Sequence, residues 1–261
     1  MVYEICAVTD QGLVRKNNED AVAVDQQTGL CLLADGMGGY NAGEVASAMA
    51  VASITRQLNS WLLHFGPRVP ARDLRWMMKT CVQNANQAIF EAACNNLDFD
   101  GMGTTLVAGV FTANRLVLSH VGDSRCYRLR YETLLQITKD HSMLQEQVDA
   151  GLMTPEQAMV SPHKNLITRA LGVERSVQVD VNEHRVEPGD LYLICSDGLS
   201  DMVETAAMTE VLNAPGSLAD KAQALVNAAN ESGGRDNISV VLVHAVWDGS
   251  RRGLLSRMLG K

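Results

Sequence analysis

Two kinds of long apolar segment are missing from this chain of 261 residues. No run of about 18 apolar residues, the length that a transmembrane helix needs, occurs in it. Its first residues also do not show the basic start and apolar stretch of a secretory signal peptide. We therefore expect a soluble cytoplasmic protein without a transmembrane segment.

Positive charge is scarce as well. The chain has 22 Lys and Arg against 30 Asp and Glu, a formal net charge of -8. A protein whose main partner is nucleic acid needs a basic patch to replace the counterions of the phosphates. The composition argues against that class, and any phosphate that the protein handles must meet local positive charge.

Metal-binding spacings of cysteine and histidine are absent too. The six cysteines include no Cys-x-x-Cys pair, and the six histidines include no His-x-x-x-His pair. These absences argue against a zinc site built on such pairs and against a dithiol redox site. Several cysteines lie inside apolar runs, so we predict that they are small core residues in a reducing compartment.

Aspartates at the ends of apolar runs are the most informative pattern that is present. Considered alone, each indicates only a strand followed by a turn. If neighbouring strands are antiparallel, however, the start of one lies beside the end of the next, and the carboxylates gather on one rim. Clustered carboxylates repel one another unless protons or cations separate them, so the pattern predicts a metal site. The four are Asp35, Asp123 and Asp197, which follow apolar runs, and Asp236, which precedes one.

The order of periodicities predicts an α+β fold. Strand-like and helix-like segments come in blocks, which favours a central β-sandwich of two antiparallel sheets flanked on each side by helices, a four-layer αββα arrangement. We expect strands 105–137 to form a meander and the strands on either side of 187–190 to form a hairpin. The predicted strands are 2–8, 21–25, 105–111, 116–121, 125–130, 134–137, 177–185, 191–196 and 238–246, and the predicted helices are 43–63, 72–93, 205–212 and 218–230.

We expect residues 1–247 to form a single domain. Segment 140–172 fits neither neighbouring block and reads as an insertion at the edge of the site. Residues 248–261 form a basic tail in which Arg and Lys alternate with Leu and Met. The tail could dock on a partner or an anionic membrane surface, or it could be a solvated, frayed terminus, which we favour.

One loop between the first two strands combines Arg15 with Glu19 and Asp20. The two carboxylates could join the rim, and a ligand set made only of oxygens favours Mg²⁺ or Mn²⁺ over zinc. Two such cations bridged by one carboxylate would activate a water and hold a phosphoryl group for in-line displacement. The planar fork of Arg15 would orient the phosphate oxygens.

A series of motifs runs through nearly the whole chain in a specific order. They are Asp10-Gln-Gly12, Arg15-Lys-Asn-Asn18-Glu19-Asp20, Asp35-Gly36-Met37-Gly38-Gly39 with Gly43-Glu44, Gly101-Met102-Gly103-Thr104-Thr105, Gly122-Asp123-Ser124-Arg125, Thr168-Arg169-Ala170-Leu171-Gly172, Ser196-Asp197-Gly198-Leu199 and Asp236-Asn237. With this set the chain resembles the PPM family of metal-dependent protein serine/threonine phosphatases (PP2C-like), in particular its bacterial branch.

The resemblance implies hydrolysis of phosphoserine and phosphothreonine on proteins by direct attack of a metal-bridged water or hydroxide. It also implies two bound Mn²⁺ or Mg²⁺ ions, with a third in some bacterial members, and a flap formed by segment 140–172. The implied ligands are Asp35 for both ions, Asp197 and Asp236 for the first, Glu19 and the Gly36 carbonyl for the second, Asp20 for a metal-bound water, and Asp123 with Asp197 for the third.

One residue departs from the animal members of that family. They carry a histidine, proposed as the general acid, directly after Asp-Gly, whereas this chain has Met37. A thioether cannot donate a proton. Bacterial relatives share the methionine, so a metal-bound water is the expected substitute.

The resemblance further implies phosphoprotein substrates, among them a cognate serine/threonine kinase and its targets, and we expect a monomer. The alternative is a regulatory module with the same fold that binds a partner without hydrolysis. Such a module should have lost part of the ligand set. Because Arg15 and all of the carboxylates named above are present, the sequence favours an enzyme.

Overall fold

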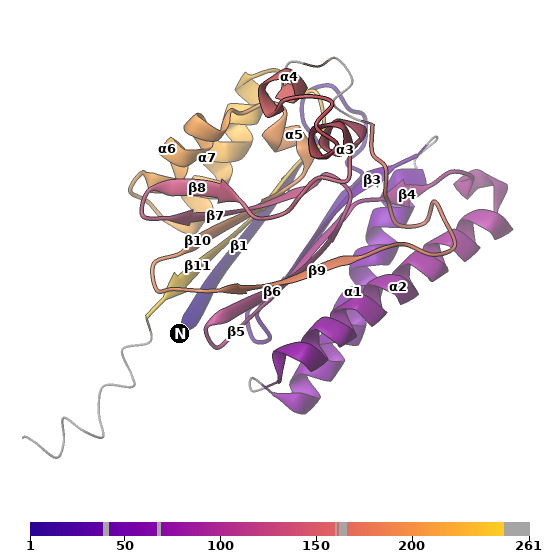
Figure 1. Ribbon diagram of the computed structural model, residues 1–261, viewed down its shortest axis with the longest axis horizontal. Helices are drawn as coiled ribbons and strands as arrows, with labels where there is room; N and C mark the ends of the chain where they lie inside the picture. Colours follow the sequence, from indigo (N-terminus) through magenta and orange to yellow (C-terminus); the bar gives the residue numbers. More distant parts are fainter. Residues whose placement is uncertain (39–41, 67–68, 160, 162–165, 248–261) are drawn as a thin grey trace, which may run out of the picture.

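The computed structural model of the protein describes residues 1–38, 42–66, 69–159, 161 and 166–247. Two antiparallel β-sheets pack face to face at its centre, and a layer of helices covers the outer side of each (Figure 1). This arrangement confirms the predicted α+β fold with four αββα layers. The basic tail, 248–261, lies outside the described residues.

Every neighbouring pair of strands in the two sheets is antiparallel. The first sheet has the order β1-β11-β10-β7-β8, from β1 (Val2–Asp10), β11 (Ile238–Val246), β10 (Leu191–Cys195), β7 (Arg125–Arg130) and β8 (Thr133–Gln136). The second has the order β2-β3-β5-β6-β9, from β2 (Asp20–Asp25), β3 (Leu30–Met37), β5 (Leu106–Thr112), β6 (Arg115–Val121) and β9 (Asp180–Arg185), and the short β4 (Gly103–Thr104) pairs with β3.

Helices α1 (Ala42–Phe65) and α2 (Ala71–Asn95) pack on the second sheet, and α6 (Thr205–Asn213) and α7 (Leu218–Glu231) pack on the first. Strand β11 shows why the layers form. Its alternate residues Ile238, Val240 and Leu242 join the cluster that contains the α6 and α7 side chains. On its opposite face, Val241, Val243 and Ala245 pack against the other sheet, so this part of the strand is apolar on both faces.

Two of the expected pairings are wrong. Strands β9 and β10 form no hairpin, because β9 pairs with β6 in the second sheet and β10 lies between β11 and β7 in the first. The predicted meander is likewise divided into β5-β6 in one sheet and β7-β8 in the other. Burial explains the first difference: all of β10 is buried, as in a central strand, whereas β9 is half exposed, as at an edge.

The remaining segments are short. Segment 140–172 contains α3 (Met143–Asp149) and α4 (Pro155–Met159), and a 3₁₀ turn, η1 (Leu97–Phe99), follows α2. Residues 160 and 162–165 of segment 140–172 lie outside the described residues. Cysteines 31, 81, 126 and 195 are buried as predicted, whereas Cys94 is exposed. No helix in the described part of the chain is long and apolar enough to cross a membrane.

Asp190, just before β10, carries a buried charge that is fully paired. Its carboxylate accepts hydrogen bonds from Nε and Nη2 of Arg130, both at 2.7 Å, and from the backbone N–H of Glu187 at 2.7 Å. Replacing Asp190 by Asn removes the carboxylate closest to Arg130 and leaves the guanidinium paired with Glu187 at 3.1 Å. We expect the free energy of unfolding in urea to fall by about 3 kcal/mol. An unchanged unfolding midpoint would show that this ion pair does not stabilise the fold.

Candidate metal centre

Strand pairing brings the predicted carboxylates to one end of the sandwich. Asp20 lies directly opposite Asp35 in the β2-β3 pair. The β1-β11 pairing ends at Asp10 and Ile238, so Asp236 lies beside the loop that carries Arg15. The antiparallel arrangement therefore gathers the ends of different strands, as the sequence predicts.

Asp197 differs in its local structure from the prediction. Strand β10 stops at Cys195, and Asp197 is the first residue of a one-turn helix, α5 (Asp197–Ser200). The next residue, Gly198, lies so close to β11 that an added Cβ would be 1.9 Å from the carbonyl oxygen of Asn237. Only glycine permits this approach, which brings Asp197 close to Asp236.

The predicted site residues line a cavity of about 730 Å³. One wall is formed by residues from segment 166–178, including Thr168 and Arg169. The segment proposed as a flap thus borders this cavity. The members of the predicted set that line it are Arg15, Glu19, Asp35, Gly36, Asp123, Asp197 and Asp236.

Asp20 is the exception, because it is not among the residues that line the cavity. One of its oxygens accepts a hydrogen bond from the hydroxyl of Ser196 at 2.9 Å. The other oxygen, Oδ1, is buried and has no hydrogen-bond partner. A buried carboxylate oxygen without a donor is costly, so this atom calls for a cation, a proton or a water.

Two threonines that the motif contained without an assigned role hold Asp35 in place. The backbone N–H of Asp35 donates to Oγ1 of Thr105 at 3.1 Å. Its carbonyl oxygen accepts from the N–H of Thr105 and from Oγ1 of Thr104, both at 2.8 Å. The backbone of Asp35 is therefore fixed from β4 and the residue that follows it.

Asn237 is a further residue whose part in the site the sequence did not reveal. Its Oδ1 accepts from the N–H of Glu19 at 2.8 Å, and its Nδ2 donates to the carbonyl oxygens of Gln11 and Asn17, both at 2.9 Å. One side chain thus joins the Arg15 loop to the start of β11. Its place next to Asp236 was the signal that could have indicated this role.

Glycines at positions 36 and 43 let the Glu19 loop approach β3. A Cβ on Gly36 would lie 2.2 Å from the carbonyl oxygen of Gly43, and one on Gly43 would lie 2.4 Å from Oε2 of Glu19. A larger residue at position 36 would force the backbone apart, and one at position 43 would displace the Glu19 carboxylate. The two glycines therefore set the position of the Glu19 carboxylate beside Gly36.

The electrostatics of the cluster favour protons or cations. Burial, followed by repulsion from Asp20 and Asp197, raises the pKa of Asp35 well above its ordinary value. Burial and the neighbouring Asp123 raise the pKa of Asp197 to about 8. Burial is also the main reason why the pKa values of Asp20 and Asp123 rise to about 6.

This donor set fits a hard divalent cation. All of the candidate side-chain ligands are carboxylates, one of them with an unpartnered buried oxygen, and their mutual repulsion disappears when a cation is shared. Within the described residues, no three of these carboxylates bring oxygens within 4.8 Å of one another. The carboxylates instead surround a cavity, which suits more than one cation. Above it, Nη2 of Arg15 donates to Asp236 at 2.6 Å.

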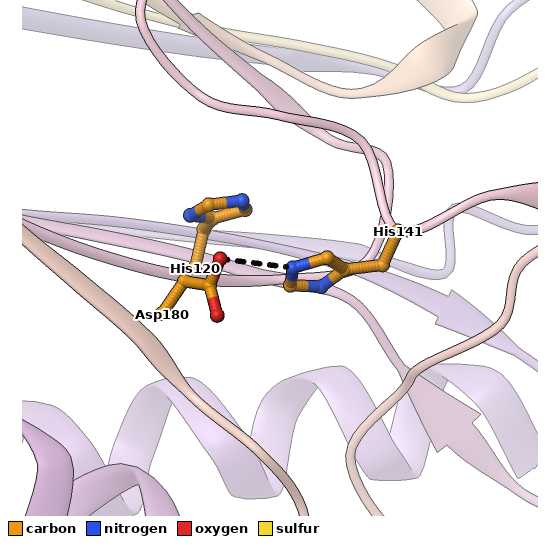
Figure 2. Close-up of side chains that lie close together, drawn as sticks. All are labelled: His120, His141 and Asp180. Atoms are coloured by element: carbon orange, nitrogen blue, oxygen red, sulfur yellow. Dashed lines mark ion pairs between the residues drawn. The ribbon is translucent and has the colours of Figure 1, made fainter. Parts of the chain in front are cut away.

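A second cluster, His120, His141 and Asp180, does meet that distance criterion (Figure 2). Its hydrogen bonds nevertheless argue against a metal. The N–H of Gly122 donates to Nδ1 of His141 at 3.1 Å, so a neutral ring carries its proton on Nε2 and has no lone pair there. Burial, then His120 and Arg169, lower the pKa of His141, which keeps the ring neutral. Arg169, 3.3 Å from Nε2, would also repel a cation.

Comparison with known proteins agrees with this geometry. Residues 14–242 match the family model described as "Protein phosphatase 2C". The chain is 41% identical over 239 residues to the serine/threonine phosphatase stp of Listeria innocua, covering 90% of this chain and 93% of that protein. It is 42% identical over 246 residues to the serine/threonine protein phosphatase PstP of Mycobacterium tuberculosis, covering 94% of this chain and 46% of PstP.

Solved structures show the same fold. A crystal structure of Mycobacterium tuberculosis PstP superposes with a TM-score of 0.85 at 42% identity, covering 95% of this chain and all of that one. The catalytic domain of PstP in complex with two manganese ions gives a TM-score of 0.82 at 41% identity, with 94% and 99% coverage. The chain retains all six predicted carboxylates, and five of them line the cavity, which favours an enzyme over a binding module without activity. It therefore belongs to the protein phosphatase 2C family.

Proposed function

We propose that this cavity hydrolyses phosphoserine and phosphothreonine side chains of proteins. The observation that carries the proposal is the set of buried, mutually repelling carboxylates that surround one cavity beside Arg15. Two bound Mn²⁺ or Mg²⁺ ions would supply an activated water and neutralise the phosphoryl oxygens. The manganese-bound PstP structure supports this choice of metal.

The family resemblance assigns the carboxylates to the cations. Asp35 would be shared by two ions, Asp197 and Asp236 would hold the first, and Glu19 with the Gly36 carbonyl would hold the second. Asp20, which pairs with Asp35 across β2 and β3, would orient a water through its unpartnered Oδ1. Asp123 with Asp197 would hold a third ion. Met37, which lines the cavity, has no proton to donate, so a water would protonate the leaving oxygen.

Phosphoproteins enter through the open side of the cavity, and segment 140–172 acts as the flap beside them. A cognate serine/threonine kinase and its targets are the proposed substrates, because such a kinase produces the groups that this chemistry removes. The chain acts as a cytoplasmic monomer, with residues 1–247 as one catalytic domain. The protein has a formal net charge of -8. In the described part of the chain, the cationic side chains that line the cavity are Arg15 and Arg169, and these would meet the anionic substrate.

Removal of metal tests the proposed function directly. Protein treated with a chelator and freed of it by dialysis should not hydrolyse a phosphothreonine peptide. Added Mn²⁺ or Mg²⁺ should restore the activity, because the carboxylates need cations to bind and activate the reactants. Full activity without divalent ions would exclude the mechanism, and binding of the peptide without turnover in Mn²⁺ would favour the non-catalytic alternative.

Arg15 should act chiefly in binding. We expect Arg15→Ala to raise KM for a phosphopeptide about tenfold, since hydrogen bonds from a charged donor contribute about 1.5–3 kcal/mol, while kcat falls less. The matched control is Lys16→Ala, which removes an exposed charge from the same loop without touching the cavity. Steady-state kinetics with both variants decide the point. An unchanged KM in Arg15→Ala would contradict a phosphate-binding role.

A further inference from the structure

His141 is a buried side chain that contacts two segments of the cavity lining. It is hydrogen-bonded to Gly122, which precedes Asp123, and it lies beside Arg169. It lies at the start of the proposed flap, in the sequence Asp140-His141-Ser142, and none of the roles above uses it. Its side chain is 6% exposed and its ring stacks on His120, with centroids 4.7 Å apart. Because the ring is held in one orientation, the groups that bind its two nitrogens are fixed relative to each other.

On one side, His141 fixes the turn that carries Asp123. The N–H of Gly122 donates to Nδ1 of the ring at 3.1 Å, and the backbone N–H of His141 donates to the carbonyl oxygen of Gly122 at 2.9 Å. Gly122 has a φ of 103°, a conformation that other residues rarely adopt. Asp123 therefore follows a turn whose two backbone groups are both bound by the same residue.

On the other side, His141 and Arg169 share a carboxylate. Nε2 of His141 is 3.5 Å from Oδ2 of Asp180, and Nη1 of Arg169 is 3.5 Å from Oδ1 (Figure 2 shows His141 and Asp180). The N–H of Thr168 also donates to the carbonyl oxygen of His141 at 2.8 Å. All the described polar contacts of the Arg169 guanidinium run through Nη1, so Nε and Nη2 have no partner among the described residues.

We propose that His141 is a positioning residue of the phosphatase reaction: Nδ1 holds the Asp123 turn for its cation, and Nε2, with Asp180, holds Arg169 toward the substrate. The inference rests on the proposed function, which makes Asp123 a cation ligand. Arg169, which lines the same cavity as Arg15, then binds an anionic group of the phosphopeptide through its Nε and Nη2 donors. A single ring thereby fixes the distance between a metal ligand and a substrate-binding cation.

Two substitutions separate the nitrogens of the ring. The side-chain oxygen of Asn can occupy the place of Nδ1, so His141→Asn keeps an acceptor for the Gly122 N–H but does not reach Asp180. The amide of Gln can occupy the place of Nε2, so His141→Gln keeps a donor toward Asp180 but offers nothing at Nδ1. A purely structural role would impair both variants in the same way.

The experiment measures two quantities for each full-length variant: the Mn²⁺ concentration at half-maximal activity and KM for a phosphothreonine peptide. His141→Gln should raise the Mn²⁺ concentration about 10–100-fold with KM preserved, since residues that orient ligands contribute to metal affinity on that scale. His141→Asn should preserve the Mn²⁺ dependence and raise KM about tenfold. His64→Gln, a change of the same type at an exposed residue of α1, is the matched control and should change neither quantity.

Two reference variants distinguish the positioning role of His141 from the proposed roles of Asp123 and Arg169. Asp123→Asn should raise the Mn²⁺ requirement, and Arg169→Ala should raise KM for the peptide. If Asp123→Asn leaves the Mn²⁺ dependence unchanged, the proposed ligand role of Asp123 is wrong and its positioning by His141 fails with it. If both reference variants behave as expected but His141→Asn and His141→Gln show the same pattern as each other, the positioning role alone is overturned.

Discussion

Replacing Asp35 by Asn is expected to abolish metal-dependent hydrolysis and, at the same time, to stabilise the metal-free protein. Asp35 lies among Asp20, Asp123, Asp197 and Asp236, whose charges all raise its pKa in addition to the effect of burial. An amide cannot bridge two cations, so we expect kcat/KM for a phosphopeptide to fall by about 10³-fold, the upper range for loss of one electrostatic element of an active site.

The stability change has the opposite sign because the wild-type carboxylate is held in an unfavourable environment. Without metal, folding must either keep a proton on Asp35 or bury a charge among like charges. The neutral amide removes that cost, and we expect the midpoint of thermal unfolding to rise by roughly 2–8 °C in chelator. Differential scanning calorimetry with chelator present measures it.

Asp190→Asn provides the comparison for Asp35→Asn. Both changes replace a buried carboxylate by an amide, but Asp190 is paired with Arg130 and does not line the cavity. That variant should lose stability and keep its turnover per folded molecule, the reverse of Asp35→Asn. If Asp35→Asn were less stable than the wild type without metal, the clustered carboxylates would not be the destabilising feature described here.

The metal-free protein should also lose stability as the pH rises from about 4 to about 8. The pKa of Asp197 is raised to about 8 in the folded state, against an ordinary value near 4. A group that binds its proton more tightly in the folded state contributes its full stabilisation below the ordinary pKa. That contribution declines as the pH approaches the raised pKa and is lost above it. Asp20 and Asp123, with pKa values of about 6, add to the decline.

Unfolding midpoints measured across this pH range in chelator, and again in saturating Mn²⁺, test the prediction. Mn²⁺ favours the ionised carboxylates, so the stabilisation it brings should grow as the pH rises. The Asp197→Asn variant should show a flatter profile in chelator. Equal slopes for the wild type and Asp197→Asn would mean that Asp197 does not hold its proton in the folded protein.

The fold could be predicted from local patterns except where pairing depends on distant strands. Strand β7 (Arg125–Arg130) and strand β11 (Ile238–Val246) begin and end where their apolar patterns do. The connection between β9 and β10 resembled a hairpin because a Pro-Gly turn joins the alternating segment 177–185 to the apolar run 191–195. The two strands belong to different sheets, because β9 pairs with β6 at a sheet edge and β10 lies between β11 and β7. These partners are remote in the sequence, and they determine that β10 is buried and β9 is half exposed.

The same limit applies to the site. Aspartates at strand ends could be identified because antiparallel pairing gathers such ends, and seven of the eight predicted positions do line one cavity. Asp20, which the sequence assigns to a metal-bound water, pairs with Asp35 in the β2-β3 ladder and does not itself line the cavity. The position of Asn237 beside Asp236 hinted at a role, but its partners could not be predicted, because they are backbone groups of a distant loop. The contacts of His141 with Gly122 and Asp180 likewise depend on the tertiary fold and leave no pattern of residue types.

The most direct test of a cation-binding phosphatase centre is the number of Mn²⁺ ions bound per chain. Equilibrium dialysis followed by metal analysis should find at least two ions bound to the wild-type protein and should find that Asp35→Asn, still folded by circular dichroism, loses them together with its activity. Undiminished Mn²⁺ binding by Asp35→Asn, or a wild-type protein that hydrolyses phosphopeptides with no bound divalent ion, would contradict the central role assigned to Asp35.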